Sequence, residues 1–187
     1  MIRILVVLAV TAATTGVATA ATAPDPKGLA LRQSDFPANA RLAFEQARRS
    51  PPLPGGGHGP AYAATFRIPR GQKREDVHIL VVTPGSAAKA RGVFARAVAD
   101  AKDFVDTVQH SNPRLPTYGD AQYVAVTGDP GAEETGGRIW VRKGSVVWGI
   151  EVSTDPLAHD FGLSRATTLA ELRTYARKEQ RRAGDGR

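Results

Sequence analysis

Few residues of this chain combine the types and spacings that catalysis or metal binding requires. The sequence has four histidines and no cysteine, and the histidines are His58, His78, His110 and His159. No two of them lie two or four residues apart, the spacings at which one strand or helix presents a pair of metal ligands. We therefore expect no metal site and no cofactor. His78 lies within an apolar run, so we expect it to be a core histidine.

A serine hydrolase is the enzyme class that needs separate consideration. Ser86 follows a predicted strand and opens a predicted helix, a position that hydrolase nucleophiles occupy. Catalysis would require His78 or His110 to approach Ser86 or Asp120 in space. The residues around Ser86 lack the G-x-S-x-G motif, and serine is a favoured helix cap. We therefore expect a cap, no catalytic residue and no enzyme.

Trp140, Tyr123 and Arg142 form a candidate recognition patch. The predicted sheet carries large apolar side chains on both faces, and two helices need not cover both. If Trp140 is uncovered, it marks a surface for a ligand or a protein partner. The alternative is that a short helix or the N-terminal segment covers Trp140, which then belongs to the core.

A basic ridge is predicted on the last helix. Arg173, Arg177 and Arg181 lie four residues apart and therefore share one helix face. Such a ridge can contact phosphates or acidic glycans, although Glu171 and Glu179 dilute its charge. The alternative is an ordinary solvated face. Specific nucleic-acid binding is not expected, because the helix has few aromatic side chains on which bases could stack.

The first twenty residues predict secretion. Arg3 precedes the apolar run Ile4 to Val10, and small residues lead to Ala18-Thr19-Ala20, a pattern typical of a signal peptide cleaved before Ala21. The alternative is an uncleaved anchor. Thr, Ala and Gly make the second half of the segment only weakly apolar for a hydrocarbon core of ~30 Å. We expect a secreted or extracytoplasmic protein without a transmembrane segment after cleavage.

Length and charge indicate one basic domain. The chain has 187 residues and a formal net charge of +7, which favours anionic partners unless the charge is only a solvated surface. The absence of cysteine excludes disulfides and thiolate sites. We expect a signal peptide at 1–20, a flexible segment at 21–28, one domain at 29–182 and a disordered tail at 183–187.

Hydrophobic periodicity predicts an α+β fold, in which a mainly antiparallel sheet of five or six strands is packed by two main helices. A Pro- and Gly-rich loop is expected at 51–60 and a polar turn at 71–75. The predicted elements are, in order, a short strand at 29–36, a short helix at 41–48, strands at 62–68 and 77–82, a helix of about 22 residues after Ser86, and then strands at 121–127, 139–142 and 145–152 and a helix at 164–182.

The two strands around Lys143-Gly144 predict a hairpin. If these two residues form the loop, Val141 pairs with Val146 and Ile139 pairs with Trp148. The rival register has a three-residue loop with Gly144 in the left-handed conformation. The residues expected to line the core are Ile139, Val141, Val146, Trp148 and Ile150.

Several short motifs carry a family resemblance. They are Ser34-Asp35-Phe36-Pro37 after Leu31, Tyr62-Ala63-Ala64-Thr65-Phe66, the helix with Ala88 and Phe94, Gly119-Asp120-Ala121, Trp140 to Val147, and Tyr175 to Arg182. With these motifs the chain resembles a group of small secreted actinobacterial proteins of uncharacterised function. Its order of elements is also similar to PsbP-like sandwiches, which implies a binding or assembly module and no particular functional residue.

Together these patterns predict a secreted, non-enzymatic domain that binds a small ligand or a cell-envelope partner through one sheet face and its bordering loops. The alternative is a basic protein retained on anionic wall polymers. The expected partner is accordingly a small molecule, an envelope polymer or another envelope protein.

Overall fold

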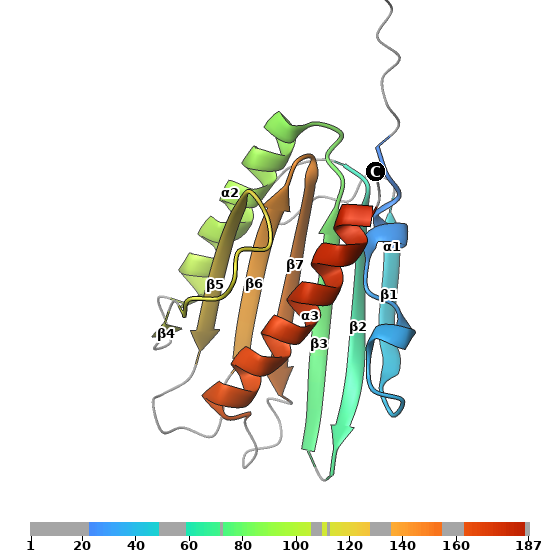
Figure 1. Ribbon diagram of the computed structural model, residues 1–187, viewed down its shortest axis with the longest axis vertical. Coiled ribbons are helices and arrows are strands. Elements are labelled where there is room, and N and C mark those ends of the chain that lie inside the picture. Colours follow the sequence, from blue (N-terminus) through green and yellow to red (C-terminus); the bar gives the residue numbers. More distant parts are fainter. Residues whose placement is uncertain are drawn as a thin grey trace, which may run out of the picture.

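The fold is an antiparallel sheet with a long helix on each face (Figure 1). The computed structural model describes residues 23–48, 59–71, 73–105, 110–111, 113–127, 136–154 and 163–185. The strand order is β1-β2-β3-β7-β6-β5-β4. The strands are β1 (Arg41–Arg48), β2 (Ala61–Arg70), β3 (Lys73–Val82), β4 (His110–Ser111), β5 (Ala121–Thr127), β6 (Gly136–Lys143) and β7 (Val146–Thr154). The helices are α1 (Pro26–Leu29), α2 (Ala87–Val105) and α3 (Arg165–Asp185), with a 3-10 turn, η1, at Gln33–Asp35.

This arrangement confirms the predicted α+β class, with two main helices packed on an antiparallel sheet. Six strands have seven residues or more, and the two-residue β4 extends the sheet. Figure 1 shows α3 crossing the front of the sheet and α2 behind it. Within the described residues, no helix is both long enough and apolar enough to cross a membrane. The predicted signal peptide and most of the 51–60 loop lie outside the described residues.

The hairpin of β2 and β3 forms as the alternating pattern predicts. Tyr62, Phe66 and Ile68 are buried on the face that α3 covers, and β3 pairs with β2 along its whole length. The predicted polar turn is too long, because Lys73 to Glu75 already belong to β3. Gly71 has φ 66° in this turn, a conformation that glycine adopts without the steric cost other residues meet.

Two predictions for the N-terminal part are wrong. The segment 29–36 is not a strand, because α1 ends at Leu29 and η1 follows. The segment 41–48 is not a helix but the edge strand β1, which pairs with β2 around a bulge between Leu42 and Phe44. Its local sequence suits a helix, but the open edge of β2 offers backbone hydrogen bonds that a local pattern does not reveal.

The β6–β7 hairpin forms in a register that neither predicted loop gave. Lys143 pairs with Val146, and Val141 pairs with Trp148, so the two loop residues are Gly144 and Ser145. Gly144 has φ 57°, which suits glycine at the first loop position. The predicted pairing is therefore wrong by two residues. An even shift keeps every side chain on its face, and all five predicted core residues are buried.

The N-terminal segment is fastened to the C-terminal half of α3. The Leu31 N–H donates to Glu179 Oε2 at 3.0 Å, and Arg182 pairs with Asp35 at 2.7 Å. The Phe36 ring stacks on Phe66, with their centroids 4.1 Å apart. The helix α1 overlaps the segment 21–28 that was expected to be flexible, and α3 continues past residue 182 to Asp185. Both ends of the packed domain therefore extend beyond the predicted limits.

Glu179 is fully buried, and this predicts a pH-dependent stability. Burial raises the pKa of Glu179 to about 8, and its hydrogen bond from Leu31 offsets this only in part. The folded-state pKa lies above the ordinary 4.5, so the contribution to stability is fully present below pH 4.5 and is lost as pH rises through about 8. Glu179→Gln keeps an acceptor for Leu31 without the charge. We expect the variant to match the native protein near pH 4 and to exceed its unfolding free energy near pH 9.

Urea unfolding at several pH values measures this difference. Glu75, whose pKa burial raises to about 7, is present in both proteins and supplies the pH dependence that remains. If plots of unfolding free energy against pH ran parallel for the native protein and Glu179→Gln, Glu179 would not titrate in the pH range tested.

Candidate functional site

The helix α2 covers only one end of the back face of the sheet. Its Ala90 and Val93 pack on Ala61, Val82 and Val147 in a small apolar cluster. Ser86 Oγ accepts the Lys89 N–H at 3.2 Å and so caps the helix as predicted. Beyond this cluster, the same face carries an open groove of about 280 Å³ between β1 and β6.

The floor of the groove is apolar, and aromatic rings stand on its two sides. Ala63, Leu80 and Gly149 line it from three neighbouring strands, with Phe44 of β1 on one side and Trp140 of β6 on the other. The strand register explains this set, because Ala63 pairs with Leu80, Leu80 with Gly149, and Gly149 with Trp140. Phe44 is 50% exposed although it is a large apolar side chain.

A polar row borders this floor two residues further along each strand. The register places Thr65 beside His78, His78 beside Glu151, and Glu151 beside Arg138. His78 Nδ1 and Thr65 Oγ1 share a hydrogen bond of 2.9 Å, and Arg138 pairs with Glu151 at 3.2 Å. The row offers a hydroxyl, an imidazole, a carboxylate and a guanidinium to a molecule lying on the floor.

His78 is exposed, so the expectation of a core histidine is wrong. Its neighbours Val77 and Ile79 are buried beneath α3, and strict alternation turns His78 to the opposite face. The sequence contains this alternation. The sequence does not reveal that α2 stops short of this part of the sheet and so leaves His78 uncovered.

The structure places the three residues of the predicted recognition patch on one face of the sheet but gives each a different environment. Trp140 lines the groove and is half-buried. Tyr123 lies opposite Trp140 in the register, but Lys102 of α2 sits 6.0 Å from its ring centroid. The Arg142 side chain is 15% exposed and pairs with Asp120 at 3.3 Å. Of the three, Trp140 alone lines the groove.

The residues considered for hydrolysis have other partners. Asp120 accepts the Gly144 N–H at 2.8 Å in addition to Arg142, and the bonds of His78 go to Thr65 and Ser153. No described hydrogen bond joins Ser86, His78 and Asp120. The part of the chain that the structure describes contains no group of three His, Cys, Asp or Glu side chains placed to hold a metal ion. His58 and His159 lie outside it.

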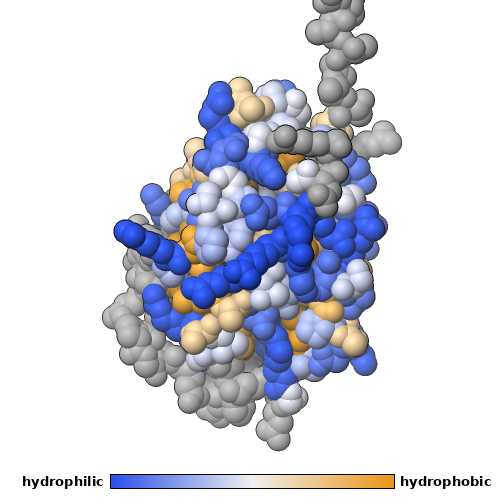
Figure 2. Space-filling view, viewed as in Figure 1, coloured by the Kyte–Doolittle hydropathy of each residue, from blue (hydrophilic) through white to orange (hydrophobic). Residues whose placement is uncertain are grey.

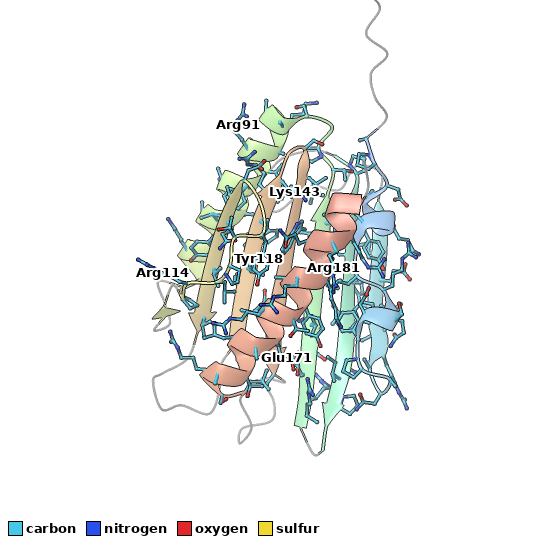
Figure 3. The ribbon with its side chains drawn as sticks, viewed as in Figure 1. Arg91, Arg114, Tyr118, Lys143, Glu171 and Arg181 are labelled. Carbon is cyan, nitrogen blue, oxygen red and sulfur yellow. The ribbon has the colours of Figure 1, made fainter. Side chains whose placement is uncertain are left out.

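The predicted ridge residues Arg173, Arg177 and Arg181 are all exposed on the outward side of α3, and Figure 3 labels Arg181 there. The prediction that Glu171 and Glu179 reduce the positive charge of this ridge is wrong. Glu171 bonds to Arg70 at 2.6 Å, and Glu179 is buried against the N-terminal segment.

The indole ring of Trp140 leaves no room for a side chain at Gly149. A Cβ on residue 149 would lie 2.6 Å from the indole ring, so Gly149→Ala must displace Trp140. We expect a loss of about 1–3 kcal/mol in unfolding free energy, measured by urea unfolding. The loss should be smaller in a Trp140→Ala background, because the two sites interact.

Gly92→Ala in α2 is the matched control. Apart from its own stretch of helix backbone, no atom lies within 4 Å of the added Cβ, so this change should stabilise the helix by up to about 1 kcal/mol. If Gly149→Ala lowered the unfolding free energy equally in the native and Trp140→Ala backgrounds, the proposed contact between residue 149 and the indole ring would be contradicted.

No protein-family model, curated protein or solved structure matches this chain. The resemblance to secreted actinobacterial proteins and to PsbP-like sandwiches therefore stays a prediction.

Proposed function

We propose that this chain is a secreted, non-enzymatic domain that binds a small ligand, or an apolar group of an envelope partner, in the groove between Phe44 and Trp140. The observation that carries the proposal is the open apolar floor beside a polar row on a sheet face that α2 covers only in part. Secretion is inferred from the signal-peptide pattern of the first twenty residues.

The size of the groove limits the part of a ligand that it can take. A volume of about 280 Å³ lies just below the usual range of small-molecule sites, which begins at ~300 Å³, and is enough for one ring system or a short hydrocarbon segment. Contact with Phe44 would remove an exposed apolar side chain from water. The polar row would then hydrogen-bond to groups at one side of the ligand. The groove therefore favours an amphipathic molecule with a flat apolar body.

The ligand can be sought directly by native mass spectrometry of the protein purified from the culture medium of its own host. A reproducible added mass is expected on the native chain and should be lost from Phe44→Ala. A bare native chain at all protein concentrations would count against a retained ligand.

The groove can also be probed with the fluorescent amphiphile anilinonaphthalene sulfonate. Phe44→Ala should weaken its binding by roughly tenfold, because a partly exposed aromatic wall worth about 1.5 kcal/mol is removed. Leu42→Ala is the control. Leu42 is similarly exposed at 45% on the same strand, and it lies outside the groove. Equal binding by both variants and the native protein would place the dye elsewhere.

A further inference from the structure

We propose that the outward face of α3 binds a linear phosphate-bearing polymer, at a site independent of the groove. Arg173, Arg177 and Arg181 form the site, which we call the α3 ridge. All three side chains are exposed, and none forms an ion pair with a described residue. Figure 2 shows hydrophilic side chains along the face that carries α3.

The acidic residues that could neutralise the ridge are held elsewhere. Glu171 points toward the sheet, where Arg70 binds it and also binds Glu75 at 3.0 Å. Glu179 is fully buried and accepts the Leu31 N–H. In the sequence these two glutamates lie among the arginines and would weaken the positive charge of the ridge. The fold turns both carboxyl groups inward. The outward face of the helix therefore keeps its positive charge.

Acidic residues of neighbouring segments are also paired. Asp35 binds Arg182 at 2.7 Å, and Asp120 binds Arg142 at 3.3 Å. Arg182, next to Arg181 in the sequence, thus takes the carboxylate of Asp35, and Arg142 on the opposite face of the sheet takes that of Asp120, while the ridge itself pairs with neither. An anion that reaches α3 would meet guanidinium groups that have no competing carboxylate among the described side chains.

A buried hydroxyl lies beside the ridge. Tyr118 is 1% exposed, and the Arg177 guanidinium lies beside its hydroxyl oxygen, while no described residue accepts the hydroxyl proton. Burial raises the pKa of this hydroxyl, and the nearby positive charges of Arg177 and Arg173 offset this only in part. Figure 3 shows Tyr118 next to α3. A phosphate oxygen held by Arg177 could accept the Tyr118 O–H, which a surface of merely solvated arginines would not offer.

The shape of the ridge favours a linear polymer. A rise of about 1.5 Å per residue spaces the arginines about 6 Å apart along the helix axis, so the site is a line of charges. Among the described exposed positions of α3 there is no large apolar and no aromatic side chain, and Tyr175 is buried. The helix therefore lacks the apolar face that inserts into membranes and the rings on which single-stranded bases stack.

The test compares two variants of the full chain that have the same net charge. Arg173→Gln/Arg177→Gln/Arg181→Gln removes the ridge, and glutamine preserves helix propensity. The control variant, Arg41→Gln/Arg91→Gln/Arg96→Gln, removes three exposed arginines of β1 and α2. Binding to inorganic polyphosphate is measured over a range of salt concentrations. The ridge variant should lose at least tenfold in affinity, and its slope of log K against log[salt] should fall by about 2, or about 0.7 per lost contact.

Three further measurements identify the binding site. Tyr118→Phe should weaken polyphosphate binding roughly fivefold without changing the salt slope, because the hydrogen bond that is lost comes from an uncharged donor. Equal losses in the ridge and control variants would reduce the effect to net charge and overturn the proposal. Tighter capture by phosphatidylglycerol vesicles than by polyphosphate would overturn it in favour of a lipid surface. Phe44→Ala should bind polyphosphate normally, so failure of the ridge and failure of the groove are distinguishable.

Discussion

The pairing of β3 with β7 joins two halves of the sheet that are otherwise built from local hairpins. β1, β2 and β3 follow one another in sequence and in space, as do β4, β5, β6 and β7 in the opposite direction. The β3–β7 ladder runs from Glu75 opposite Thr154 to Val82 opposite Val147. It brings together segments about 70 residues apart, so its closure carries a large entropic cost that the apolar residues on both faces must offset.

This central register aligns side chains across the whole sheet. His78 and Glu151, or Leu80 and Gly149, become neighbours because β3 and β7 meet in that register. A shift by one residue would turn these side chains into the core and bring valines and isoleucines to the surface. The front core and the rear groove are therefore consequences of the same ladder. Both faces of the sheet are specified at once.

Helix α3 combines two opposite electrostatic environments. Its inward side holds buried carboxyl groups, and burial raises the pKa values of Glu75 beneath it and of Glu179 on it. These groups are costly to ionise inside the protein, yet they anchor Arg70 and the backbone of the N-terminal segment. The outward side carries arginines, while the neighbouring carboxyl groups of Glu171 and Glu179 point toward the protein interior. The contacts that dock the helix thus also leave its exposed face strongly basic.

The sequence by itself determined the strands β2, β3, β5, β6 and β7, the helices α2 and α3, and the face on which each core side chain of the last hairpin lies. These features depend on periods of 2 and 3.6 residues, which are local and survive a register error of two residues. The tertiary structure alone decided that 41–48 is a strand, that His78 is exposed, that Trp140 lines a groove while Arg142 does not, and that Glu171 and Glu179 turn away from the ridge. Each of these depends on which distant segment supplies a hydrogen bond or a covering side chain, and hydrophobic periodicity carries no information about that.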